Sequence, residues 1–220
     1  MSNRYRDRRD AGRQLATLLG DYAGRDDVIV LGLPRGGVPV AFEVSRALGV
    51  PLDILLVRKL GVPGFEELAL GAIASGGVRF LNDDVVRAHH VPPAAIEAVT
   101  ASEWRELGRR EHRYRAFRPE VDLTGRTVIL VDDGLATGAT MRTAIAAVRA
   151  RFAGRVVAAV PVAAHEICAA MGRIADDAVC ALTPDSFDAV GRWYDDFGAT
   201  DDDEVIALLA EAERRQASAP

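Results

Sequence analysis

The chain has 220 residues, of which 49% are hydrophobic, and its formal net charge at pH 7 is −5. This length suits one domain with appendages, and the hydrophobic share is enough for a full core. The acidic balance argues against a general affinity for nucleic acid, and no stretch approaches the ~20 apolar residues that span a bilayer. Residues 1–16 lack the apolar core of a signal peptide, so we expect a cytoplasmic protein without membrane or nucleic-acid partners.

The chain contains only two cysteines, Cys168 and Cys180. Two cysteines make neither a disulfide framework nor a zinc site. We therefore predict two buried, free thiols in a reducing cytosol.

The first predicted helix covers residues 7–19, where alanine and leucine recur at helical spacing. Arg8, Arg9 and Arg13 lie on its other face. We interpret them as a solvated face, and the alternative is that one of them reaches a ligand or a partner subunit.

A buried strand is predicted over residues 28–33 and a helix over 38–48, with the sequence Pro-Arg-Gly-Gly between them. Backbone amides at such a helix start, together with Arg35, can bind an anion. An ordinary turn between a strand and a helix is the alternative.

The next predicted strand, residues 52–57, is followed by Arg58 and Lys59. Two cations at the carboxyl end of a strand would face the same crevice as Arg35, where a diphosphate is their natural partner. A pair of surface charges is the alternative.

Residues 61–77 are rich in glycine, which suggests a mobile segment with a possible β-ribbon over 69–81. Glu66 and Glu67 in this segment are acid/base candidates, although a solvated loop explains them as well. Helix is predicted over 83–117, with a restart at Pro92-Pro93. Its arginine-rich end, residues 109–115, could be a solvated face, a subunit contact or a basic rim for a polyphosphate.

The most informative segment is 127–142, where an apolar run ends in Asp132 and Asp133 and a small-residue loop leads into an alanine-rich helix. In parallel sheets, ligands bind beyond the carboxyl ends of the strands. Carboxylates accept bonds from vicinal hydroxyls, whereas the helix start and the hydroxyls of Thr137 and Thr140 suit a phosphate. The segment matches neither a Walker loop nor a dinucleotide turn. It predicts a sugar-phosphate site, with a plain strand–loop–helix connection as the alternative.

Two further strands are predicted over 156–160 and 177–182, with a helix over 165–171 between them. Alternating strands and helices with short connections imply a parallel sheet with helices on both faces. The following stretch, 183–198, holds four aromatic residues: Phe187, Trp193, Tyr194 and Phe197. They either anchor a C-terminal helix over 205–209 or form a stacking wall for a flat acceptor.

The decapeptide VDDGLATGAT, residues 131–140, closely resembles the phosphoribosyl pyrophosphate (PRPP) motif of type I phosphoribosyltransferases. The resemblance implies an α/β fold with a parallel-sheet, Rossmann-like core. It also implies that Asp132 and Asp133 hold the ribose hydroxyls. The 5′-phosphate would lie in the loop formed by Gly134, Leu135, Ala136, Thr137, Gly138, Ala139 and Thr140.

The same resemblance implies that the loop at 34–37 cradles the pyrophosphate. This loop often contains a non-proline cis peptide in the family, and Pro34–Arg35 is the candidate bond for one in this chain. The expected partners of the pyrophosphate are Arg35, Gly36, Gly37, Arg58 and Lys59. We expect four of the site residues to act in catalysis: Asp132, Asp133, Arg35 and Lys59. Mg²⁺ is implied as the cofactor, bridging diphosphate and ribose oxygens. The sequence shows no all-protein cage for it, although Asp132 or Asp133 could lie near the ion.

In this family the acceptor-binding part, the hood, often comes from the ends of the chain, so Trp193 and Tyr194 are the candidates for acceptor binding. The predicted organisation is one domain, with a core at about 28–182, a mobile loop and helical insertion at about 61–118, and a hood at about 183–213. Dimers are common in the family, so a homodimer is expected.

The function that the resemblance implies is transfer of the 5-phosphoribosyl group of PRPP to a nitrogenous acceptor, with release of pyrophosphate, and a nucleobase is the expected acceptor. Ala136 stands where 6-oxopurine enzymes often have an aspartate, which disfavours guanine and hypoxanthine. The alternative is a non-catalytic, PRPP-binding regulatory protein of the same fold. A sugar-phosphate hydrolase is a third reading, but no water-activating base or metal cluster is evident.

Overall fold

The computed structural model describes residues 4–115 and 120–217, and the chain forms two compact units. The first unit comprises Met1–Leu55 and Val121–Pro220, and the second comprises Leu56–Glu120. Each unit is built on a sheet of its own. Within the described ranges, no helix combines the length and the apolar character that a membrane crossing requires.

The sheet of the first unit has five strands in the order β2-β1-β6-β7-β8, and all neighbours are parallel. Its strands are β1 (Val28–Gly32), β2 (Leu52–Ile54), β6 (Thr127–Val131), β7 (Arg155–Val162) and β8 (Asp177–Leu182). The central strands β1 and β6 are buried at every residue, because strands pair with them on both sides and helices cover both faces. The predicted parallel α/β core is confirmed.

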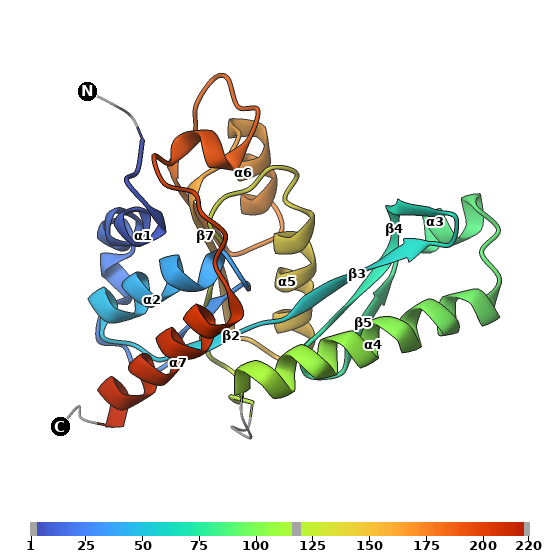
Figure 1. Ribbon diagram of the computed structural model, residues 1–220, viewed down its shortest axis with the longest axis horizontal. Coiled ribbons are helices and arrows are strands. Elements are labelled where there is room, and N and C mark those ends of the chain that lie inside the picture. The colour runs from blue at the N-terminus through green and yellow to red at the C-terminus, as the bar shows by residue number, and fades with distance from the viewer. Residues whose placement is uncertain (1–3, 116–119, 218–220) are drawn as a thin grey trace. The chain divides into compact units, whose positions relative to one another are not determined.

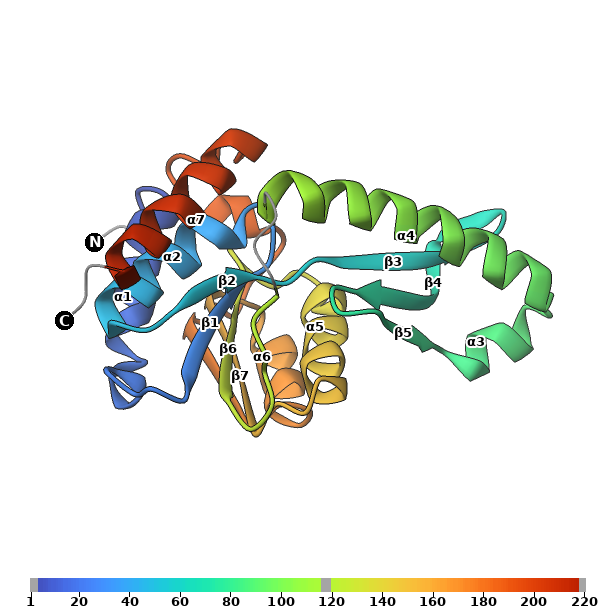
Figure 2. The same ribbon diagram turned by 90° about the horizontal axis from the view of Figure 1, so that it is seen from below.

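Helices lie on both faces of this sheet (Figure 2). One face carries α1 (Arg8–Thr17), α2 (Gly37–Leu48) and α7 (Asp202–Ala217), and the other carries α5 (Ala139–Ala150) and α6 (His165–Gly172). Two short 3-10 turns, Gly20–Tyr22 and Val190–Trp193, complete the unit. The core under α1 and α2 packs leucine and valine side chains of the helices onto β1, β6 and β7.

Two arginines of α1 depart from the predicted solvated face. Arg9 and Arg13 lie 3.6 and 3.8 Å from the carboxylate of Glu43, whose side chain is only 1% exposed. A buried carboxylate needs cationic partners because its desolvation is otherwise costly. These two arginines therefore serve the packing of α1 on α2.

The predicted strand over 52–57 is wrong in its second half. The amide of Leu55 still bonds to the Gly32 carbonyl on β1, 3.1 Å away, but the amide of Leu56 bonds to the hydroxyl of Ser75, 3.1 Å away, in the second unit. The backbone thus changes partners between these two leucines. Arg58 and Lys59 consequently lie inside an antiparallel strand and not at the carboxyl end of a parallel one.

The second unit is a three-stranded antiparallel sheet with two helices, α3 (Asp83–Ala88) and the long α4 (Pro93–Arg115), and α4 runs along the sheet (Figure 1). Its strands are β3 (Val57–Val62), β4 (Phe65–Ala74) and β5 (Val78–Leu81). The predicted β-ribbon is therefore confirmed, but it begins earlier, and the mobility of this segment stays a prediction. The helix restart at Pro92-Pro93 is confirmed, whereas Phe117, where helix was predicted to end, lies outside the described residues.

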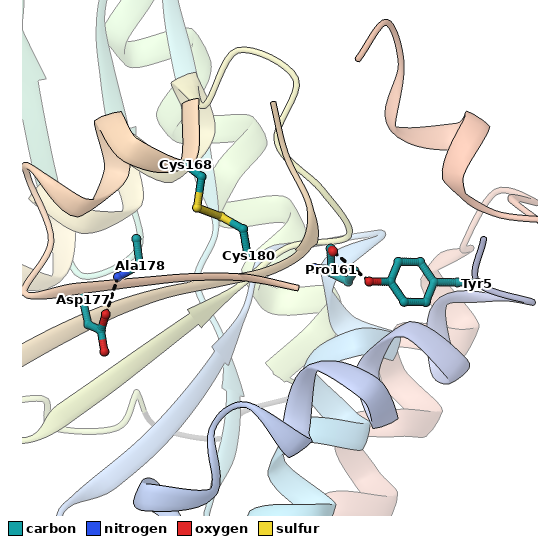
Figure 3. Close-up of a disulfide and its surroundings, with 6 residues drawn as sticks. All are labelled: Tyr5, Pro161, Cys168, Asp177, Ala178 and Cys180. Atoms are coloured by element: carbon teal, nitrogen blue, oxygen red, sulfur yellow. Dashed lines mark hydrogen bonds between the residues drawn. A yellow bond between two sulfur atoms is a disulfide. The ribbon is translucent and has the colours of Figure 1, made fainter. Parts of the chain in front are cut away.

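The prediction of free cysteines is wrong. Cys168 on α6 and Cys180 on β8 form a disulfide with a Cα–Cα distance of 6.3 Å (Figure 3). The chain reverses between α6 and β8, which brings the two residues to the spacing that a disulfide needs. Both are half-buried. The expectation of a reducing compartment loses the support that free thiols would have provided.

Candidate functional site

The loop that follows β6 forms the centre of the site. It is tied to the neighbouring strand by the Leu135 amide, which donates to the Val162 carbonyl at 2.9 Å. A pocket of about 180 Å³ opens above it. The pocket is lined by Asp132, Gly134, Leu135, Ala136, Thr137, Gly138, Ala139, Thr140, Met141 and Val190. All the loop residues predicted to bind a phosphate are thus brought together in one cavity.

The start of α5 points its backbone amides at this loop. Gly138 is the N-cap and supplies no side-chain acceptor, and the first turn holds no acidic residue. Its φ of +73° and the approach of Met171 Cε, 3.0 Å from an added Cβ, explain why glycine stands here. The amide of Ala139 makes one long hydrogen bond, 3.4 Å, to the hydroxyl of Thr137. A helix start of this kind, without an acidic side chain in its first turn, favours an anion such as phosphate.

The acid pair lies between the loop and β6. Asp132 lines the pocket, and its Oδ1 accepts a hydrogen bond from the Asp133 amide at 2.9 Å. Burial, and then repulsion from Asp133, raise the pKa of Asp132 well above its usual range. Burial also raises the pKa of Asp133, while Arg8 opposes this rise. Two half-buried carboxyls that repel each other gain from a ligand that offers hydroxyl donors.

The glycine loop after β1 packs directly on this acid pair. A Cβ at Gly36 would lie 2.0 Å from Asp133 Oδ2, and a Cβ at Gly37 would lie 3.1 Å from Asp132 Oδ1. The Pro34–Arg35 peptide, the candidate bond, is cis. The Arg35 side chain is half exposed and lies 3.9 Å from Asp202 at the start of α7. Both predicted anion loops therefore meet within the first unit.

Arg58 and Lys59 belong to the second unit. The guanidinium of Arg58 forms ion pairs with Glu103 and Glu106 on α4. Both cations line a pocket of about 640 Å³ between β3 and α4, together with Val57, Gly61, Pro63, Gly64, Glu66, Val99, Ser102 and Glu103. Their predicted contact with diphosphate remains a prediction.

The aromatic stretch, residues 183–198, contacts the backbone of the acid pair. The hydroxyl of Tyr194 donates to the Asp133 carbonyl at 2.5 Å, and its ring lies 5.5 Å from that of Tyr5 and 4.9 Å from that of Phe197. Tyr194 is only 3% exposed, so its predicted role as a stacking surface for an acceptor is corrected to a supporting one. Trp193 is partly buried beside the same cluster, and its role toward an acceptor stays a prediction.

Two residues outside the predicted site list also belong to the site: Arg8 and Val190. Arg8 Nε donates to Asp133 Oδ2 at 2.8 Å, and only 12% of the side chain is exposed, so Arg8 does not belong to the predicted solvated face. The alternative that an arginine of this helix reaches a ligand or a partner subunit stays a prediction. Val190 lines the phosphate pocket, and a Cβ at Gly134 would lie 2.5 Å from its Cγ1. Nothing in the local sequence marks Val190, since it stands in an irregular stretch without a motif.

A five-stranded parallel sheet, with an acid pair at its carboxyl edge followed by a glycine-capped phosphate loop, defines the phosphoribosyltransferase class. The chain belongs to the phosphoribosyl transferase domain family, whose family model matches residues 4–171.

Relatives of known sequence and structure agree with this membership. The chain is 54% identical over 213 residues to proteins of Mycobacterium tuberculosis strains CDC 1551 and H37Rv, whose names assign them provisionally as phosphoribosyl transferases. Each match covers 97% of this chain but 48% of the relative, so the chain spans about half the length of these curated relatives. The crystal structure of TT1426 from Thermus thermophilus is 45% identical with a TM-score of 0.84, and the match covers 94% of this chain and 98% of that one.

Proposed function

We propose that this chain binds PRPP and transfers its 5-phosphoribosyl group to a nitrogenous acceptor, with release of pyrophosphate. The observation that carries the proposal is the meeting of two anion loops at one acid pair. Asp132 and the loop 134–140 line one pocket, and Gly36 and Gly37 pack against the carboxylates of Asp133 and Asp132. A lone sugar phosphate would need only the first loop, whereas PRPP carries phosphate groups at both ends of its ribose.

In this proposal the first loop binds the 5′-phosphate. The amides at the start of α5 and the hydroxyls of Thr137 and Thr140 provide its donors. Gly138 lets the backbone approach the phosphate closely because it has no side chain.

The acid pair would then hold the ribose. A hydroxyl of the sugar donates to Asp132, which lines the pocket, and the carboxylates place negative charge near C1. During transfer the bond between C1 and the diphosphate oxygen breaks, and the acceptor nitrogen forms a new bond to C1. Positive charge develops on the ribose in this step, so carboxylates that are already in place lower its cost.

The departing pyrophosphate would lie at the glycine loop. Gly36 and Gly37 leave room for it beside the acids, and Arg35 supplies a half-exposed cation next to that loop. An arginine can hold a phosphate with two parallel hydrogen bonds.

Mg²⁺ is the ion expected to accompany PRPP. In the described part of the chain, no three histidine, cysteine, aspartate or glutamate side chains are close enough together to hold a metal. Asp133 is in addition already bonded to Arg8. These residues fit an ion carried mainly by substrate oxygens, where it would neutralise part of the diphosphate charge.

The test is a panel of acceptors with PRPP and Mg²⁺: adenine, 6-oxopurines, uracil, orotate and non-base amines. Release of pyrophosphate with one of them supports transfer. Asp132→Asn should abolish it, whereas Asp21→Asn, the same change at an exposed position in the turn after α1, should not. Tight PRPP binding without turnover of any acceptor would favour a regulatory protein of the same fold. Absence of PRPP binding to the intact protein would refute the proposal.

A further inference from the structure

Arg8, the first residue of α1, lies where the acid pair meets the hood. Its Nε donates to Asp133 Oδ2 at 2.8 Å, and its Nη1 donates to the Gly198 carbonyl at 2.6 Å. The centre of the guanidinium lies 3.9 Å from the centroid of the Phe197 ring. Only 12% of the side chain is exposed. A planar guanidinium can make these three contacts at once, because it stacks on a ring with its face and donates from its edges.

The backbone on both sides of Arg8 is fixed by separate contacts. Tyr5 forms a bridge to Tyr194, and its hydroxyl donates to the Pro161 carbonyl at 2.8 Å (Figure 3). Asp7 caps α1 by accepting a hydrogen bond from the Asp10 amide at 2.7 Å. The direction in which Arg8 leaves the backbone is therefore set by the surrounding structure and not by its own contacts alone.

The glycine loop packs closely against the contact between Arg8 and Asp133, although a cavity of about 330 Å³ lies beside Arg8 on the side of Gly198 and Thr200. A Cβ at Gly36 would lie 3.2 Å from Arg8 Nε, and the Asp133 side chain is only 17% exposed. A carboxylate that is this buried needs a partner close by, since water cannot solvate it fully. Arg8 also brings positive charge to a place where two acids would otherwise repel an anionic ligand.

We propose that Arg8 is a positioning residue that couples the hood segment Phe197–Gly198 to the carboxylate of Asp133. Ligand binding at the acid pair and order in the hood then depend on each other, as thermodynamic linkage requires. The inference rests on the proposed function for the identity of the ligand, PRPP, but the contact between hood and acid pair exists without it.

The first experiment needs no ligand. Amide hydrogen exchange is followed over residues 194–200 in the intact protein and in three variants: Arg8→Gln, Arg8→Lys and Arg6→Gln. The last is the control, because Arg6 is 72% exposed and its side chain pairs with Asp10, 3.1 Å away, on α1 itself. Arg8→Gln should speed exchange in this segment by about 10-fold or more, and Arg6→Gln should leave it unchanged.

The second experiment adds PRPP and uses Trp193 as a reporter of the hood. The chain has two tryptophans, so a Trp104→Phe background leaves the fluorescence of Trp193 alone. Arg8→Gln should weaken PRPP binding by about 10- to 100-fold, the worth of a hydrogen bond to a charged group. Arg8→Lys should recover much of this affinity through its charge, while hood exchange stays fast, because an ammonium cannot stack on Phe197 and also reach Gly198.

The outcomes separate the two proposals. If Arg8→Gln matches Arg6→Gln in hood exchange and in PRPP affinity, the positioning role is refuted. An equal loss in Arg8→Lys and Arg8→Gln for both readouts refutes it too, since a merely structural arginine would show that pattern. If the intact protein does not bind PRPP, the proposed function fails, and the exchange experiment still decides whether Arg8 couples hood and acid pair. Should Arg8→Gln not fold, hood exchange alone decides: it should be faster in Arg8→Lys than in Arg6→Gln, and equal exchange in the two variants refutes the positioning role.

Discussion

The substitution Gly36→Ala tests the packing of the glycine loop on the acid pair. The new methyl group would lie 2.0 Å from Asp133 Oδ2 and 2.7 Å from its Cγ. Unbonded carbon atoms prefer a separation of about 3.5–4.0 Å, so the carboxylate must move by roughly 1 Å or more. Gly36 has φ −60° and ψ −32°, which alanine adopts without strain. The clash therefore falls on Asp133 and not on the backbone of the loop.

Two effects of this movement can be measured. A misplacement of about 1 Å in a catalytic site can cost about 100-fold in rate, so pyrophosphate release should fall by that order. Separation of Asp133 from Arg8 breaks a charged hydrogen bond worth about 1.5–3 kcal/mol, and each 1 kcal/mol lowers Tm by about 2–4 °C in a chain of this size. PRPP affinity by calorimetry and Tm by scanning calorimetry report the two effects separately.

Gly20→Ala is the matched control, because a Cβ at Gly20 meets nothing within 4 Å. It should change neither PRPP affinity nor Tm by a comparable amount. If Gly36→Ala behaves like Gly20→Ala in both measurements, the loop does not pack on Asp133 as described, and the two-loop site loses its basis.

Three further predictions concern the same unit. Asp132→Asn should abolish PRPP binding yet raise stability at neutral pH. Because the native pKa of Asp132 is raised, the free energy of unfolding of the wild type falls as the pH rises above about 4 toward that pKa. Urea unfolding at about pH 5 and about pH 8 should show this fall in the wild type and not in the variant. Tyr194→Phe should cost about 1 kcal/mol by removing the bond to the Asp133 carbonyl, and an unchanged Tm would contradict this. Cys168→Ser removes the disulfide to Cys180 and should lower the free energy of unfolding by about 2–4 kcal/mol. A reductant should lower the free energy of unfolding of the wild type by the same amount and should leave that of the variant unchanged.

Most of the parallel sheet was predictable because most of its strands are short apolar runs, and α-helices follow β1, β6 and β7. The apolar runs predict strands over 28–33, 127–131 and 177–182, and the structure has strands at 28–32, 127–131 and 177–182. For the apolar run over 52–57 the same reasoning gave a strand that is too long. Its apolar pattern continues past Leu55, but the backbone partner changes from Gly32 to Ser75 at that point. The local apolar pattern does not reveal which distant strand or side chain a backbone amide bonds to.

The same distinction applies to the site. Asp132 and the loop 134–140 form one continuous motif, so their grouping could be predicted from residues that follow one another. Arg8 lies 125 positions from Asp133, and an arginine opposite the apolar side of a helix looks like any solvated charge. The disulfide could not be predicted for a related reason: the sequence separation of Cys168 and Cys180 does not show that α6 and β8 lie side by side in the fold.

The contact between Arg8 and Gly198 has a consequence for how the protein is made. These residues are 190 positions apart, so the first leaves the ribosome long before the second exists. At about 5–20 residues per second, roughly 10–40 s of synthesis separate them. The strands β6, β7 and β8 and the phosphate loop are all made within that interval, so they exist before the segment Phe197–Gly198 that completes the surroundings of Asp133. In a nascent chain, the contacts of Arg8 with Phe197 and Gly198 can therefore form only near the end of synthesis, after the acid pair and the phosphate loop have been made.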